Sequence, residues 1–214
     1  MKKPPLNTEE VRFLGEGGVQ FRAASEGDEQ KPAAFVGQAI VCGVRSKNLG
    51  GFVEIIDPKA LDNADMSDVK GLFNHNPDFL LGTTRAGTLT LARSADGGLN
   101  YEIAYDDTDP DHQRVMAKIR RGDIVGSSFA FRVAPNGDNW VHESTDDSDI
   151  YVRTVTAFSK VADVSPVTNP AYADTTTAHR SLDAYKQAHP DTPEVRQVPL
   201  SVRRRQLKLL ELAA

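Results

Sequence analysis

Three separated segments of the chain carry the residue types that a serine hydrolase requires. His75 stands between Asn74 and Asn76-Pro77, a serine pair stands at Ser127-Ser128, and Asp163 lies in a third, apolar segment. An imidazole that accepts a proton at neutral pH, a hydroxyl nucleophile and a carboxylate can together perform nucleophilic catalysis. Such triads are recognised by geometry rather than by chain order, and the order His, Ser, acid differs from that of the three best-known serine hydrolase folds.

Strand alternation separates the two serines. Successive side chains of a strand point to opposite faces, so Ser127 shares a face with the phenylalanines at 129 and 131, whereas Ser128 shares the other face with Ala130. If the phenylalanines face the core, Ser127 is buried and Ser128 points outward, where a polypeptide can reach it. Alternation therefore selects Ser128 as the nucleophile. On this pattern alone, two structural serines with satisfied hydroxyls are the commoner arrangement.

The other two members also have alternatives. A histidine beside an apolar run is more often a packing or surface residue, but Asn76-Pro77 places His75 at a rigid loop edge. We expect His112 to be solvated on a helix, and His179 and His189 to lie in a weakly ordered tail. A carboxylate within the apolar strand around Asp163 requires a partner, which the imidazole of His75 or an arginine such as Arg153 could supply.

Short phrases run in a fixed order from about residue 35 to about residue 180. They are Gly37–Ile40, Gly51–Ala60, Asn74-His75, Leu81–Thr83, Gly98–Tyr101, Ser128–Phe131, and Asp163–Ser165 continuing to Pro170–Tyr172. As an ordered set they resemble the prohead maturation proteases of tailed bacteriophages, relatives of the herpesvirus assemblins. The sequence departs from that family at Asp163, where Glu is commoner, and at Ala130, where Gly is commoner. Either carboxylate can orient a histidine.

The resemblance implies catalytic roles for His75, Ser128 and Asp163 in a serine endopeptidase that processes phage capsid or scaffold precursors and cleaves itself. Its expected partners are the major capsid protein and the scaffold, inside the immature capsid in the cytoplasm of a bacterial host. His142 is an alternative third member, because the herpesvirus relatives use a histidine there. The rival interpretation is a non-enzymatic scaffold or capsid-assembly protein that retains the same barrel.

Composition excludes several other classes. The 214 residues suffice for one sizeable domain with tails, and the net charge of −5 creates no field that favours nucleic acid or an acidic membrane. The single cysteine, Cys42, excludes an internal disulfide and fits a buried position in an apolar strand better than a nucleophile. No run is apolar enough for a membrane span or a signal peptide, so we expect a soluble, intracellular protein whose self-association is left open. Because neither zinc-site spacing nor a phosphate loop is present, we expect no metal and no cofactor.

Alternating and apolar segments predict a β-rich chain. We expect strands at Ala34–Val44, Phe52–Ile56, Leu80–Thr84, Thr88–Arg93, Leu99–Tyr105, Ile124–Val133, Trp140–Glu143, Tyr151–Phe158 and Val161–Val167. Asp109-Pro110 and Gly122 bracket a helix, and Glu16–Gly18 favours a short hairpin between Val11–Phe13 and Val19–Arg22.

Many short strands with few helices predict a β-rich α+β fold, a closed or nearly closed antiparallel β-barrel of the assemblin kind. Three divisions are expected: a polar N-terminal extension (1–33), the barrel domain (34–178), and a linker with a C-terminal amphipathic helix (179–214). The tri-arginine run Arg203–Arg205 at the start of that helix could bind nucleic acid, but the acidic overall balance and the absence of interleaved aromatic residues count against this. Docking of the helix onto a partner or onto the protein itself is favoured instead.

Overall fold

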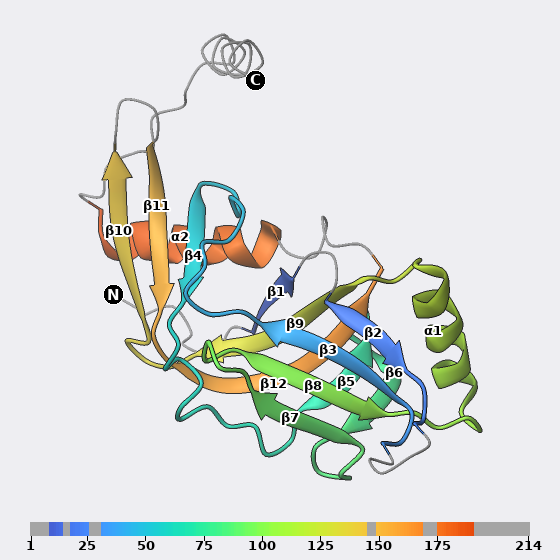
Figure 1. The fold of residues 1–214 in the computed structure, drawn as a ribbon. Coiled ribbons are helices and arrows are strands. Elements are labelled where there is room, and N and C mark those ends of the chain that lie inside the picture. Colours follow the sequence, from blue (N-terminus) through green and yellow to red (C-terminus); the bar gives the residue numbers. More distant parts are fainter. Residues whose placement is uncertain (1–8, 15–17, 26–30, 145–148, 169–174, 191–214) are drawn as a thin grey trace, which may run out of the picture.

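The computed structural model describes residues 9–14, 18–25, 31–144, 149–168 and 175–190, with the side chains of 175–179 left out. Strands and two helices follow one another along these residues (Figure 1). The elements are β1 (Glu10–Leu14), β2 (Val19–Arg22), β3 (Ala34–Ile40), β4 (Phe52–Ile56), β5 (Lys70–Phe73), β6 (Asn76–Thr83), β7 (Leu89–Arg93), β8 (Leu99–Ala104), α1 (Pro110–Arg121), β9 (Gly126–Val133), β10 (Asp138–Ser144), β11 (Asp149–Val155), β12 (Phe158–Val167) and α2 (Thr175–Ala188).

The strands form three open sheets. Their orders are β1-β9-β12-β5-β6, β10-β11-β4 and β2-β3-β8-β7. Two pairings, β12 with β5 and β11 with β4, are parallel, and the remaining pairings are antiparallel. The sheet that matters most for the candidate site is the five-stranded one, because it brings β9, β12 and β5 side by side.

The prediction of a closed or nearly closed antiparallel barrel is wrong. Within the part of the chain that the structure describes, β1 and β6 are the outer strands of one sheet and β2 and β7 those of another, and no sheet closes on itself. Closure requires every strand to have two partners in a consistent register. Strand-like segments reveal that strands exist but not which edges meet, so the sequence could not distinguish a barrel from packed open sheets. The β-rich character and the small number of helices are as expected.

The expected hairpin between β1 and β2 is also wrong. β1 pairs with β9, from Glu10 opposite Phe131 to Leu14 opposite Ser127, whereas β2 pairs with β3. Both strands are therefore built into different sheets. The division of the chain at residues 33 and 178 stays a prediction, and the linker beyond residue 190 and the C-terminal helix lie outside the described residues.

Helix α1 has the ends that the sequence predicted. The Asp109 side chain accepts a hydrogen bond from the main-chain N–H of Asp111, Pro110 occupies the first turn, and Gly122 ends the helix with a left-handed φ of 82°. Val115 and Ile119 face the main core. The helix thus delivers the chain to the start of β9, which carries the serine pair.

The main core lies between the four- and five-stranded sheets. Its fully buried large side chains include Phe35, Leu99, Tyr101, Ile103 and Phe131. A second, smaller cluster joins the three-stranded sheet to α2 through Phe52, Tyr151 and Leu182. Helix α2, which is far from β1 and β4 in the sequence, is thereby packed beside them (Figure 1).

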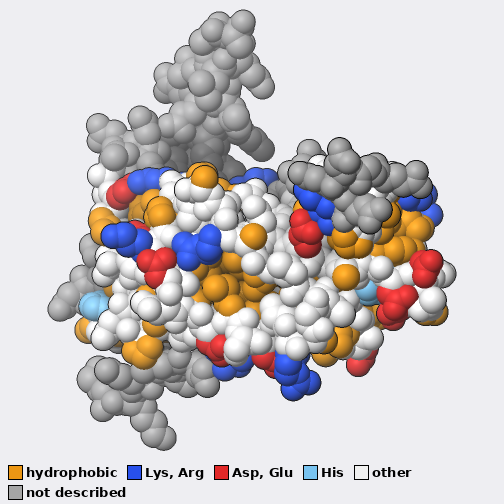
Figure 2. Space-filling model, turned by 60° about the horizontal axis from the view of Figure 1, so that its bottom comes forward, with side chains coloured by type: hydrophobic (Ala, Val, Ile, Leu, Met, Phe, Trp, Pro, Cys, Tyr) orange, Lys and Arg blue, Asp and Glu red, His pale blue; other side chains and the backbone are white. Residues whose placement is uncertain are grey.

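The face shown in Figure 2 carries apolar side chains near its centre, with acidic and basic side chains of both signs around them. The two signs are interspersed among the described residues of this face, in keeping with the nearly balanced composition. Of the helices formed by the described residues, none has the length and apolarity needed to cross a bilayer.

Candidate active site

His75 is held by a strained two-residue turn. Asn74 and His75 connect β5 to β6, with Phe73 paired to Asn76, and their φ angles are 55° and 56°. Positive φ at both central residues is what a type I′ hairpin turn requires, and asparagine and histidine tolerate it better than most residues. The turn therefore sets the backbone from which the imidazole of His75 projects.

The last strand of the sheet pins this turn. The main-chain N–H of Asn74 donates to the carbonyl of Pro166 at 3.0 Å, and the Asn74 side chain exchanges hydrogen bonds with Thr168. The main-chain N–H of His75 donates to Ser165 Oγ at 3.3 Å. Residues of β12 and the position just after it thus fix the backbone from which the imidazole projects.

Three strands bring His75, Ser128 and Asp163 together. His75 Nε2 lies 2.6 Å from Ser128 Oγ, and His75 Nδ1 lies 2.6 Å from Asp163 Oδ1. A carboxylate can only accept, so the proton of the neutral ring sits on Nδ1 and leaves Nε2 free to accept from the serine. The cluster can therefore transfer a proton from a serine hydroxyl to an imidazole that a carboxylate orients.

The two serines point to opposite faces of β9, as alternation predicted. Ser127 Oγ donates to the hydroxyl of Tyr101 in the core at 2.9 Å, whereas Ser128 Oγ contacts His75. The expectation that Ser128 is exposed is wrong, because both serines have 0% exposed surface. Alternation predicts which face of the sheet a side chain is on, but it cannot show that the His75 imidazole and the Arg12 carbonyl of β1 cover the Ser128 side chain on that face.

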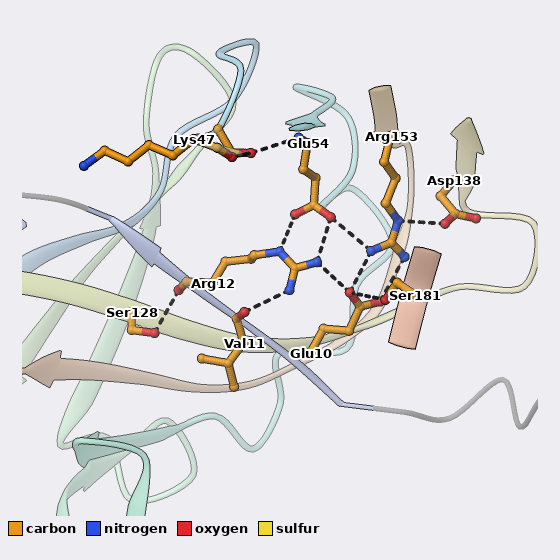
Figure 3. Close-up of polar contacts among 10 residues, drawn as sticks. Glu10, Val11, Arg12, Lys47, Glu54, Ser128, Asp138, Arg153 and Ser181 are labelled. Atoms are coloured by element: carbon orange, nitrogen blue, oxygen red, sulfur yellow. Dashed lines mark hydrogen bonds and ion pairs between the residues drawn. The ribbon is translucent and has the colours of Figure 1, made fainter. Parts of the chain in front are cut away.

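One group against the Ser128 hydroxyl belongs to β1. Ser128 Oγ lies 2.8 Å from the carbonyl oxygen of Arg12, in a position to donate to it (Figure 3). The hydroxyl has a single proton and two acceptors, the Arg12 carbonyl and His75 Nε2. The position of β1 thus bears directly on where the serine proton points.

A buried network of charges anchors β1. Arg12 pairs with both oxygens of Glu54 and with Glu10, and Arg153 pairs with Glu10, Glu54 and Asp138 (Figure 3). Ser181 of α2 donates to Glu10 at 2.9 Å. Each charge is met by opposite charges and by directed hydrogen bonds, which offsets the cost of removing it from water.

The network shifts the pKa values of Glu10 and Arg153. Burial alone would raise the pKa of Glu10, but the hydrogen bond and charge of Arg153, with help from Arg12 and Ser181, outweigh it and lower that pKa to about 2. The pKa of Arg153 is raised, because its hydrogen bond to Glu10 and the surrounding carboxylates outweigh the opposing effect of burial. Glu10 and Arg153 are therefore both charged at neutral pH.

Ser165 completes the immediate surroundings of the cluster. It is fully buried on β12, directly opposite Ser128 in the register of the sheet. Its hydroxyl donates to Asp163 Oδ1 at 2.9 Å while accepting from the main-chain N–H of His75. It shares a strand face with Asp163, and the sequence signals that pointed to Ser165 were this spacing and its place in the phrase Asp163–Ser165.

The remaining sequence candidates lie elsewhere. The expected solvation of His112 is wrong: it is 4% exposed, accepts from the main-chain N–H of Asp106, and packs against Phe35. His142 lies on β10, with Nε2 2.7 Å from Asp149 Oδ1. His189 lies just after α2, within contact of Tyr185, and the His179 side chain is outside the described part of the chain.

Two alternative assignments are not supported by these contacts. Arg153, which could have paired with Asp163, is engaged by Glu10, Glu54 and Asp138. Cys42 is buried, and this burial, with the nearby charge of Asp96, raises the pKa of its thiol to about 11. A thiol that stays protonated at neutral pH is a poor nucleophile.

Sequence reasoning missed Arg12 altogether. Its role depends on a main-chain carbonyl, which any residue type possesses, and on a pairing of β1 with β9 across more than a hundred residues.

Among the described residues, no group of three or more histidine, cysteine, aspartate or glutamate side chains is placed to hold a metal ion.

Comparisons with known proteins identify the family of the chain. A search among curated proteins finds no match. One solved structure, described as the bacteriophage T4 capsid assembly protease gp21, is similar at a TM-score of 0.41 and 9% identity, covering 76% of this chain and 100% of that one. The profile of the family described as caudovirus prohead serine protease matches residues 20–188, which include His75, Ser128 and Asp163. The chain belongs to the caudovirus prohead serine protease family.

Proposed function

We propose that the chain is a serine endopeptidase in which Ser128 is the nucleophile, His75 the general base and Asp163 the residue that orients His75. The observation that carries this proposal is the continuous series of contacts from Ser128 Oγ through both nitrogens of His75 to Asp163 Oδ1, each 2.6 Å long. Membership of a serine protease family supports the same roles. No other histidine among the described residues has both a serine and a carboxylate as hydrogen-bond partners.

The proposed reaction follows from these atoms. Ser128 Oγ attacks the carbonyl carbon of the scissile peptide bond while its proton passes to His75 Nε2, and Asp163 stabilises the imidazolium that forms. Collapse of the tetrahedral intermediate breaks the C–N bond, and His75 gives the proton to the leaving nitrogen. Water, deprotonated by His75, then attacks the acyl-enzyme, and the proton returns to Ser128 as the acid product leaves.

Access to Ser128 requires movement. Because Ser128 has no exposed surface, a peptide carbonyl reaches its Oγ only after the groups now covering it are displaced. The proton of Ser128 must also point to His75 rather than to the Arg12 carbonyl when attack begins. Binding of a substrate therefore has to change the geometry around Ser128.

The proposed substrates are the precursor of the major capsid protein and the scaffold protein, cut inside the immature capsid within the bacterial host. The family to which the chain belongs supports this choice, since a prohead is an immature capsid. Cleavage is expected to remove scaffold and the N-terminal extension of the capsid precursor.

Labelling by a fluorophosphonate probe tests the activity, because only an activated serine reacts with it. Wild-type protein should be labelled on Ser128, and Ser128→Ala should not be labelled. Incubation of a capsid precursor with the protein, followed by mass spectrometry, then identifies the bonds that are cut. A wild-type protein that is neither labelled nor proteolytic would favour the alternative, a non-enzymatic scaffold or capsid-assembly protein.

Self-cleavage near the C-terminus is the second part of the proposal. We expect the cut between about Thr177 and Ser201, because the stretch Asp191–Glu194 is polar and rich in helix breakers. Helix α2 runs to Ala188 with Leu182 buried, and a protease cuts extended rather than helical backbone, so the bond should lie after residue 188. Intact-mass measurements on wild type and Ser128→Ala, purified side by side, should show a shortened chain in wild type only.

A further inference from the structure

Ser165 contacts two members of the proposed triad at once. Its hydroxyl donates to Asp163 Oδ1 at 2.9 Å and accepts from the main-chain N–H of His75 at 3.3 Å. A hydroxyl has one proton and two lone pairs, so both hydrogen bonds can form together. The side chain has no exposed surface, which places both bonds in a low-dielectric region where they are strong.

The bond to His75 acts on the strained turn. Both residues of the turn have left-handed φ angles, a conformation that a non-glycine residue keeps only when its surroundings impose it. Asn74 is fixed by Pro166 and Thr168. Ser165 fixes the backbone of His75 in the same way, because its hydroxyl accepts the hydrogen bond from the main-chain N–H of His75. The position from which the imidazole projects thus depends on a hydroxyl on the neighbouring strand.

The bond to Asp163 acts on the carboxylate. The last torsion of an aspartate is broad and roughly two-fold, so an unconstrained carboxylate can rotate and present either oxygen. Oδ1 is the atom that accepts from both Ser165 and His75 Nδ1. The Ser165 hydroxyl therefore selects one orientation of the carboxylate, the one that lies in line with the imidazole.

We infer that Ser165 is a positioning residue that fixes His75 and Asp163 relative to each other, acting as a fourth member of the site without touching substrate. The inference rests on the proposed serine protease function. Ser127 is the matched control: it is the neighbour of Ser128, it is equally buried, and its hydroxyl donates away from the site to Tyr101.

Inactivation kinetics with a fluorophosphonate separate positioning from binding, using the full-length chain. Ser165→Ala should lower the maximal rate of inactivation by about 10- to 100-fold while leaving the half-saturating probe concentration nearly unchanged, because small misplacements of reacting groups cost about this much. Ser127→Ala should stay within about 2-fold of wild type in both quantities, since it breaks no contact of the triad. Equal rates for Ser165→Ala and Ser127→Ala would overturn the inference.

A spectroscopic measurement reads the geometry without catalysis. The proton between His75 Nδ1 and Asp163 Oδ1 should give a far-downfield proton NMR resonance, identified by its loss in His75→Ala. This resonance should shift or broaden in Ser165→Ala and stay in place in Ser127→Ala; an unchanged resonance in Ser165→Ala contradicts the inference. If wild type fails to react with the probe, the protease proposal fails, but the resonance still decides the role of Ser165.

A second variant guards against misfolding. Ser165→Cys nearly conserves the buried volume but replaces the hydroxyl with a weak donor and acceptor. It should fold, as judged by thermal unfolding, and should lose inactivation rate as Ser165→Ala does. A Ser165→Cys protein that reacts at the wild-type rate would show that volume, rather than hydrogen bonding, is what position 165 provides.

Discussion

At the scale of single residues, neighbours in the chain have separate tasks because β9 divides its faces between core and site. Ser127 satisfies the hydroxyl of the fully buried Tyr101, and Ser128 contacts His75 and the Arg12 carbonyl. Strand alternation was enough to predict this division from the sequence. It was not enough to predict that Ser128 is covered, because the cover includes β1, a partner that local pattern does not reveal.

The serine pair provides the first prediction. Ser128→Ala should lower proteolysis by more than about 10³-fold with the fold intact, as removal of a triad member does in serine proteases. Ser127→Ala should retain most activity but lose about 1 to 3 kcal/mol of stability, since it leaves the Tyr101 hydroxyl without its partner. Proteolysis assays and denaturant unfolding of both variants check this, and the reverse pattern would exclude Ser128 as the nucleophile.

Two buried or half-buried histidines provide the second prediction. His75→Ala should lose nearly all turnover because it removes the proton acceptor. His112→Ala should keep turnover near that of wild type but lower the melting temperature, because His112 packs against Phe35 and Tyr105 and accepts from the N–H of Asp106. Turnover and thermal unfolding should be measured on the same preparations. Comparable losses of turnover in both variants would count against His75 as the base.

At the scale of elements, local signals were predictive and long-range pairing was not. The ends of α1 at Asp109 and Gly122 and the strand Phe52–Ile56 could be predicted, because caps and alternation act over a few positions. The barrel and the β1–β2 hairpin could not be predicted correctly, because each depends on which strand edges meet. The choice of His75, Ser128 and Asp163 did not depend on the topology, because it rested on residue type and family resemblance. The structure brings the three side chains within hydrogen-bond distance, and their catalytic roles stay a prediction.

The anchoring of β1 provides the third prediction. Glu54→Gln should destabilise the protein by about 3 to 5 kcal/mol, because it leaves Arg12 and Arg153 buried with too little opposing charge. Glu143 forms a comparable two-bond pair with Arg45 on the surface, so Glu143→Gln is a matched control and should leave stability close to that of wild type. Denaturant unfolding in low and high salt distinguishes them; equal losses would mean that burial of the network adds nothing.

At the scale of the whole molecule, the buried charges link stability to acidity. The pKa of Glu10 is lowered from its usual 4.5 to about 2 in the folded protein, so between these values the unfolded state binds more protons. Its stabilising effect, about 3 kcal/mol in order of magnitude, is therefore complete above about pH 4.5 and disappears as the pH falls to about 2.

A comparison of Glu10→Gln with wild type across this range is the fourth prediction. The variant should be less stable at pH 7, and the gap between the two free energies of unfolding should narrow as the pH falls from 4.5 towards 2. Glu9→Gln changes an exposed neighbour and should run parallel to wild type. A gap for Glu10→Gln that stays constant from pH 7 to pH 3 would contradict the lowered pKa.

The long sequence distances between Glu10 and its partners also determine when the site can form during synthesis of the chain. While the chain is being synthesised, Arg12 of β1 has no partner until Glu54 has been made. Glu10 gains its partners only with Arg153 and finally with Ser181, which lies 171 positions after Glu10 in the chain. Until those residues have been synthesised, the charges of Glu10 and Arg12 lack their partners, and the contacts that hold the Arg12 carbonyl against Ser128 are incomplete. The site around the nucleophile is thus completed only after residue 181 has been synthesised, so an interrupted chain that already contains His75, Ser128 and Asp163 still lacks the finished site.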